Sequence, residues 1–126
     1  MNAIGIASVS IVPLRAEASD ASEQTSQILG GEGVSLLEEG RGEWVKVKSL
    51  EDGYVGWCDR RQFMFDVKLP EERTMLCHPM SQWNNERTLA ALWMPAGALI
   101  EEREDAYFLG ADKITPFNPD TVQDDV

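Results

Sequence analysis

The residues best suited to covalent chemistry are two cysteines and one histidine. Cys58 follows Trp57 in the segment YVGWC, and Cys77 and His78 are adjacent in the segment TMLCHP. A cysteine nucleophile needs a nearby imidazole that a third polar group orients. In an extended chain neighbouring side chains point to opposite faces, so Cys77 and His78 cannot form such a pair with each other. Cys58 could meet His78 only through folding, and its place after Trp57 fits the core better.

Metal binding and acid–base catalysis find no better support in the sequence. The chain has one His, two Cys and no second Cys-x-x-C, which excludes most zinc sites and any disulfide framework. We interpret Cys58 and Cys77 as small buried hydrophobic residues. Neighbouring carboxylates such as Glu38 and Glu39 diverge along a strand, so solvated surface charge explains them better. The sequence therefore predicts no enzyme activity, no metal and no cofactor.

Short β-strands are the elements that must position any site in the first half. They are expected at residues 8–14, 25–29, 34–38, 44–48 and 54–58, separated by segments rich in Gly, Ser, Asp and Glu. The segment EGRGE at 39–43 predicts a hairpin turn, and residues 59–63 predict a single helical or 3₁₀ turn. In the strand at 44–48, Val45 and Val47 take one face and Lys46 and Lys48 the other, so one face is expected to be buried and the other wet or partner-facing. Such closely spaced strands predict a small closed barrel.

The second half carries a weaker strand pattern after a linker at residues 64–72. Strands are expected at residues 74–79, 88–94, 98–101, 106–109 and 113–117. Residues 88–94 also have the composition of a short helix, but Pro95 and Gly97 leave little room for one, so a strand is preferred. Residues 120–126 form a polar tail that we expect to be frayed.

Charge and hydropathy limit the partners of the chain. Its 126 residues carry 22 Asp and Glu against 11 Lys and Arg, a net charge of −11 that is spread over both halves. Such a chain repels nucleic acid and anionic membrane surfaces. It has no apolar stretch approaching the roughly 20 residues that span a bilayer, and no basic residue before Arg15. As it stands, the sequence predicts a cytoplasmic protein, or a protein of the cell envelope if a leader has been removed.

Several segments of the first half follow one another in the order typical of bacterial SH3 (SH3b) domains. They are VPLRAE at 12–17, SE at 22–23, QILGGE at 27–32, VSLLE at 34–38, EWVKV at 43–47 and DGYVGW at 52–57, followed by Asp59-Arg60. On these motifs the first half resembles an SH3b domain. More narrowly, RAEASDASE together with DGYVGW resembles the first barrel of NlpC-type, papain-like cell-wall peptidases.

In that family two SH3b barrels precede a catalytic domain that cuts the D-glutamyl to diaminopimelate bond of peptidoglycan stem peptides. The second half is similar to the second barrel through its PAGALI turn and AYFLG segment, whereas the family's nucleophilic D-C-S-G motif is absent. The resemblance implies an all-β fold of two small SH3-like barrels packed together. The first would occupy residues 1–66, and the second, divergent barrel and its frayed tail would occupy residues 67–126.

The resemblance also indicates binding residues. In the resembled peptidases, loops of the first barrel help to hold the free amine of the stem peptide, and the matching residues are Glu17, Ser22, Glu23 and Tyr54. A carboxylate and a phenol suit an ammonium group that leaves water. Trp44 borders a loop, where an exposed aromatic residue often anchors a ligand or partner. The loop at 15–24 has no aromatic residue, which argues against binding of proline-rich peptides.

Three functions follow as hypotheses. The first is a non-catalytic module that docks on, or forms the front part of, an NlpC-type peptidoglycan hydrolase, in cis or in trans, and modulates its substrate specificity. The second is a stand-alone module that binds peptidoglycan stem peptides, against which the acidity of the chain argues because cell walls are also acidic. The third is an enzyme with an unrecognised site, for which we expect no turnover of stem peptides.

Overall fold

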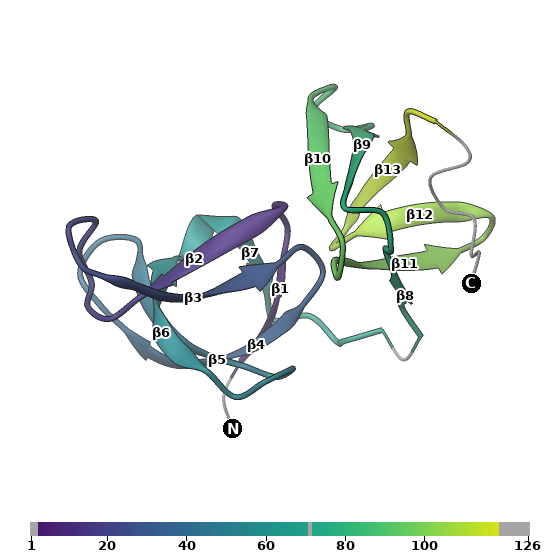
Figure 1. Cartoon of the computed structure of the whole chain (residues 1–126). Helices are drawn as coiled ribbons and strands as arrows, with labels where there is room; N and C mark the ends of the chain where they lie inside the picture. The colour runs from purple at the N-terminus through teal and green to yellow at the C-terminus, as the bar shows by residue number, and fades with distance from the viewer. Residues whose placement is uncertain (1–2, 71, 119–126) are drawn as a thin grey trace.

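The regular structure of the described residues is β-strand, apart from one short 3₁₀ helix, in a computed structural model (Figure 1). The structure describes residues 3–70 and 72–118. The strands form two antiparallel sheets, one of seven strands and one of six, which confirms the predicted all-β class. In this part of the chain no helix is long and apolar enough to cross a membrane. The predicted frayed tail at 120–126 lies outside the described residues.

The N-terminal sheet contains every strand between residues 4 and 65. Its strands are β1 (Ile4–Ala7), β2 (Ile11–Arg15), β3 (Gln24–Leu29), β4 (Gly33–Glu39), β5 (Trp44–Ser49), β6 (Val55–Asp59) and β7 (Phe63–Phe65), with the 3₁₀ helix η1 (Arg60–Gln62) before β7. Their order in the sheet is β3-β2-β6-β5-β4-β1-β7. The predicted hairpin at 39–43 and the 3₁₀ turn are confirmed.

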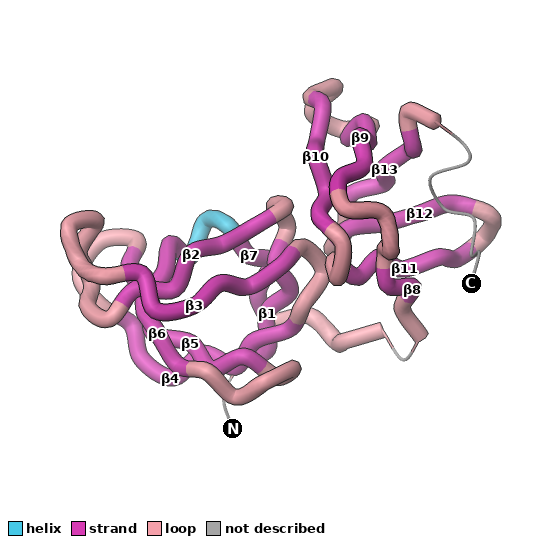
Figure 2. Tube along the Cα trace, viewed as in Figure 1, coloured by secondary structure: helices cyan, strands magenta, loops and turns pink. Residues whose placement is uncertain are grey.

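The sheet curls around its core but does not close (Figure 2). After η1 the chain enters β7, which pairs with β1, so that β7 and β3 are left as the two edges. The prediction of a closed barrel was therefore wrong. The strand prediction from sequence also missed β1 and β7, because these strands of four and three residues are too short to show a clear apolar alternation.

The core of the N-terminal sheet follows from alternation along its strands. In β5, Val45 and Val47 are buried while Lys48 is exposed, as the sequence predicted. The buried cluster consists of Ala7, Val12, Leu14, Ile28, Val34, Val45, Val47, Cys58 and Phe63. A register shift between Leu36 and Glu38 turns Leu37 toward solvent on the other face. The outward face of β5 and β6 is thus free of core packing and available for a site.

The C-terminal sheet contains six strands. They are β8 (Thr74–Met75), β9 (Met80–Asn85), β10 (Ala91–Pro95), β11 (Leu99–Arg103), β12 (Ala106–Leu109) and β13 (Asp112–Pro116), in the order β10-β9-β13-β12-β11-β8. The preference for a strand over a helix at 88–94 is confirmed by β10. The sequence prediction missed β9, which lies between the strands expected at 74–79 and 88–94. Here too the two edge strands leave the sheet open.

A glycine turn joins the two sheets. The Leu99 N–H donates to the Gly30 carbonyl at 2.8 Å, and Arg73 Nη1 donates to the Gly31 carbonyl, also at 2.8 Å. Gly31 has a φ of 82°, and a Cβ at this position would lie 1.6 Å from the Leu99 carbonyl oxygen. Only glycine combines this backbone conformation with so close an approach. The two sheets therefore pack on each other, as predicted, although the boundary at residue 66 stays a prediction.

Candidate functional site

The two cysteines occupy opposite environments. Cys58 is buried in the N-terminal core, and burial, with a smaller effect of the Asp59 charge, raises the pKa of its thiol to about 12. Cys77 is exposed, which corrects the prediction that it is buried. It lies two residues past the end of β8, between the buried Leu76 and the bend at His78 and Pro79, where neighbouring side chains take opposite directions. No group of three or more His, Cys, Asp or Glu that could hold a metal occurs among the described residues.

This contrast predicts selective thiol labelling. Treatment of the native protein with iodoacetamide at about pH 8 should modify Cys77 and spare Cys58, because alkylation requires an accessible thiolate. Mass spectrometry of the digested protein measures both sites. Denaturant should make Cys58 reactive, and equal labelling of both cysteines in the native protein would contradict the buried placement.

The raised pKa of Cys58 also makes the stability of the fold depend on pH. The protonated, buried thiol contributes to the free energy of unfolding below about pH 9, and this contribution is lost as the pH rises toward 12.

A cleft of about 390 Å³ opens beside Trp44 on the N-terminal sheet. We call it the Trp44 cleft, and its lining is Asp20, Arg41, Gly42, Glu43, Trp44, Asp59 and Arg61. Three segments build it: the loop at 16–23, the β4–β5 turn, and the end of β6 with the start of η1. The turn is held by the Gly40 N–H, which donates to the Trp44 carbonyl at 2.9 Å, and by the Trp44 N–H, which donates to the Arg41 carbonyl at 3.2 Å.

Part of the charge in the Trp44 cleft is neutralised internally. Arg61 binds the Asp59 carboxylate with two nitrogens, Nε to Oδ1 at 3.0 Å and Nη2 to Oδ2 at 2.7 Å. This hydrogen bonding lowers the pKa of Asp59 and raises the pKa of Arg61. No side-chain hydrogen bond or ion pair engages Asp20, Arg41 or Glu43 within the described ranges. The cleft therefore offers one guanidinium and two carboxylates beside an indole ring.

The structure brings only one of the predicted binding residues into this cleft. Trp44 lines it, whereas Glu17 and Glu23 are exposed elsewhere on the same loop that contributes Asp20. Ser22 organises that loop: its Oγ accepts from the Glu17 N–H at 2.9 Å, and its carbonyl accepts from Arg15 Nη1 at 3.0 Å. These contacts give Ser22 a role in the shape of the loop.

Tyr54 lies at the other end of the β5–β6 hairpin. Trp44 pairs with Asp59, and four residues further along β5 Lys48 pairs with Val55, next to Tyr54. At the rise of a β-strand this separates the two ends by about 13 Å. Tyr54 is 59% exposed, and its N–H donates to Asp52 Oδ1 at 3.1 Å. The two predicted aromatic residues therefore do not share one cleft.

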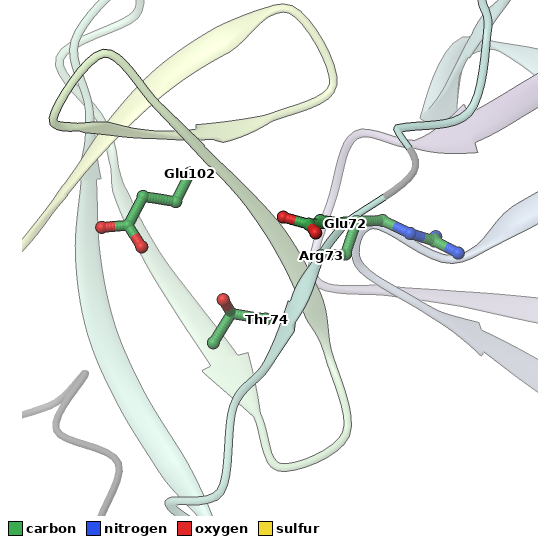
Figure 3. A pocket seen from close by; sticks show the side chains of 4 residues that line it. All are labelled: Glu72, Arg73, Thr74 and Glu102. Carbon is green, nitrogen blue, oxygen red and sulfur yellow. The ribbon is translucent and has the colours of Figure 1, made fainter.

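A second hollow, of about 520 Å³, lies against the C-terminal sheet and is lined by Glu72, Arg73, Thr74 and Glu102 (Figure 3). The guanidinium of Arg73 points away from Thr74 and Glu102 and is engaged by Gly31 and by Glu51, whose Oε1 lies 3.5 Å from Nη2. Two carboxylates and a hydroxyl remain, with no aromatic side chain to anchor a ligand. This hollow is the weaker candidate.

The two hollows differ in their relation to a known family. Residues 14–63 match the model of the bacterial dipeptidyl-peptidase SH3 domain. This segment is a bacterial SH3 domain. Every residue that lines the Trp44 cleft lies within the SH3 domain, and none of those around the second hollow does. No curated protein matches the chain, and no catalytic domain was identified in it.

The sequence analysis did not identify most of the residues that line the Trp44 cleft. Asp20, Arg41, Glu43, Asp59 and Arg61 were passed over in favour of residues suggested by the resemblance. Arg41 offered a signal of its own, since it is a cation at the tip of a hairpin turn, three residues before a tryptophan, in a chain with twice as many acidic as basic residues. We take the Trp44 cleft as the candidate functional site.

Proposed function

We propose that the chain is a non-catalytic SH3b module that docks on, or forms the front part of, an NlpC-type peptidoglycan hydrolase and modulates which stem peptides the hydrolase accepts. The match of residues 14–63 to an SH3 domain of bacterial dipeptidyl-peptidases carries this proposal. The order of the SH3b motifs, and their resemblance to the first barrel of those hydrolases, support the choice of partner.

The chemistry of the Trp44 cleft supports a short peptide as the ligand that the module and the hydrolase bind together. A short stem peptide carries a free amine and several carboxylates. Asp20 and Glu43 suit the amine, and Arg41 suits a carboxylate, to which a guanidinium can donate two parallel hydrogen bonds. The partly exposed indole of Trp44 adds apolar contact area at a low cost in conformational entropy. In this proposal the module presents one wall of a peptide groove, and the hydrolase supplies the other wall.

The proposal is tested by adding the chain to a purified NlpC-type catalytic domain. We expect binding in a calorimetric titration and a changed preference among stem peptides of different length, measured as kcat/KM. Trp44→Ala and Arg41→Ala should each weaken the effect about tenfold, which is typical of a central contact residue. Lys48→Ala is the matched control, since it removes an exposed cation from the same strand face outside the cleft. Absence of interaction at high micromolar concentration would overturn docking in trans.

Direct binding of stem peptides is the second candidate, and the presence of both charge signs in the Trp44 cleft favours it. Cosedimentation of the chain alone with peptidoglycan sacculi separates this function from docking. Binding to sacculi that Arg41→Ala abolishes would support it. Binding that persists in both Trp44→Ala and Arg41→Ala would assign the wall contact to another surface.

A further inference from the structure

The edge strand β10 of the C-terminal sheet has unpaired backbone groups. Along its inner side, the Asn85 N–H donates to the Ala90 carbonyl at 3.0 Å and the Ala96 N–H donates to the Pro79 carbonyl at 3.3 Å. Backbone groups of successive residues alternate in direction in an antiparallel ladder, so Ala91, Trp93 and Pro95 turn theirs away from β9. The Pro95 carbonyl accepts from the Ala98 N–H at 3.3 Å, so the N–H groups and carbonyls of Ala91 and Trp93 are the ones that line the free edge.

The same edge carries an exposed apolar face. Trp93 pairs with Gln82, and Pro95 pairs with Met80, so the side chains of Trp93 and Met80 share the outward face. The Phe117 N–H donates to the Gln82 carbonyl at 2.9 Å, which brings Phe117 beside them. Trp93, Met80 and Phe117 are 54%, 53% and 67% exposed. We call these three residues the β10 face.

Strand β10 lacks the charged residues that usually protect a sheet edge from pairing. Its sequence, Ala-Leu-Trp-Met-Pro, contains no Lys, Arg, Asp or Glu, and only Pro95 at its end cannot donate a backbone hydrogen bond. Natural edge strands are commonly blunted by charges, bulges or a covering segment. An uncharged edge with an exposed tryptophan favours the addition of another extended segment.

We propose that β10 is a docking edge for an extended, positively charged peptide segment of a partner protein, which pairs with β10 as an added strand. Backbone hydrogen bonds to Ala91 and Trp93 would fix its position, and the side chains on its outward face would pack beside Trp93. The net charge of −11 favours a basic segment by long-range attraction. This surface is separate from the Trp44 cleft and does not depend on the function proposed for that cleft.

Charge and area both argue against a second copy of the chain as the occupant. Two copies repel each other, since each carries a charge of −11. Complete coverage of the β10 face would remove roughly 400 Å² on each copy, judged from the usual area of large side chains. Stable interfaces between proteins bury about 1,200–2,000 Å² in total. A short peptide held by backbone hydrogen bonds needs no such area to bind transiently.

A designed peptide tests the proposal. The probe is a fluorescein-labelled peptide of alternating valine and threonine flanked by lysines, and its control has prolines in place of the threonines. We expect saturable binding of the probe alone by fluorescence polarisation. We also expect slower hydrogen exchange of the Ala91 and Trp93 amides when the probe is added to the unaltered chain, a measurement that requires no variant.

Two variants locate the binding edge. Trp93→Lys should weaken probe binding at least about tenfold, because it removes the aromatic contact and adds a like charge. Met75→Lys makes the same charge change on β8, at the opposite edge of the same sheet, where Met75 is 60% exposed, and should change binding less than about twofold. No binding at millimolar probe, an equal loss in both variants, or a dimer in sedimentation that Trp93→Lys dissociates would each overturn the proposal.

Discussion

Replacing Gly31 by Ala is expected to lower the free energy of unfolding by about 3 kcal/mol and to loosen the contact between the two sheets. An Ala at this left-handed φ costs about 1–2 kcal/mol in backbone strain. Its Cβ would also lie 1.6 Å from the Leu99 carbonyl oxygen, so the backbone of one sheet must move away from the other. Such overpacking typically costs a further 1–3 kcal/mol.

Gly42 provides a matched control for the Gly31 substitution. Its φ of 62° imposes a similar backbone strain, but nothing lies within 4 Å of a Cβ at this position. Gly42→Ala should therefore cost only about 1–2 kcal/mol. Thermal unfolding measures both variants, and hydrogen exchange of the Leu99 amide, which donates to Gly30, reports on the contact directly. Equal losses in the two variants would show that the approach of Leu99 to Gly31 contributes nothing.

Replacing Trp83 by Ala is expected to unfold the C-terminal sheet. Trp83 is completely buried, its Nε1 donates to Ser81 Oγ at 3.0 Å, and its ring forms a T-shaped pair with the Tyr107 ring at a centroid distance of 5.6 Å. Loss of a buried aromatic side chain costs about 3–5 kcal/mol. A sheet of this size has little stability to lose. Near-ultraviolet circular dichroism and the NMR signal of Tyr107 should report loss of the packed core.

Trp93→Ala is the control for the Trp83 substitution, because it removes the same side chain from the neighbouring strand at a position that is 54% exposed. It should change the stability by less than about 0.5 kcal/mol. Trp83→Phe should lie between the two, since it keeps most of the volume and loses the hydrogen bond to Ser81. A Trp83→Ala protein with an intact C-terminal sheet would contradict the assigned core.

Strand alternation made much of the fold predictable from sequence. Val45 and Val47 against Lys48 correctly predicted one buried face, and Pro95 with Gly97 correctly predicted a strand at β10. The prediction failed where pairing depends on distant segments. Strand β7 has three residues and is defined only by its pairing with β1, about 60 positions away in the chain. The open edges of the sheet follow from that pairing and could not be predicted from local pattern.

The candidate site was less predictable than the fold. Trp44 could be singled out from sequence because it is an aromatic residue beside a turn; the structure places it in the cleft, and its role in binding stays a prediction. Asp20, Arg41 and Asp59 come from three separate segments that meet only after the sheet curls. The loop that holds Glu17 and Glu23 is closed on itself by Ser22, and this internal hydrogen bonding leaves no trace in the sequence.

The glycine contact between the sheets has a consequence for affinity. Gly30 and Gly31 fix one sheet on the other, so the Trp44 cleft and β10 are held at a constant distance and are not joined by a flexible linker. A ligand long enough to reach both would bind the second surface at a high effective concentration once the first is occupied. The overall affinity of such a ligand would then exceed its affinity for either surface alone by about 10² to 10⁴, the factor usual for linked sites.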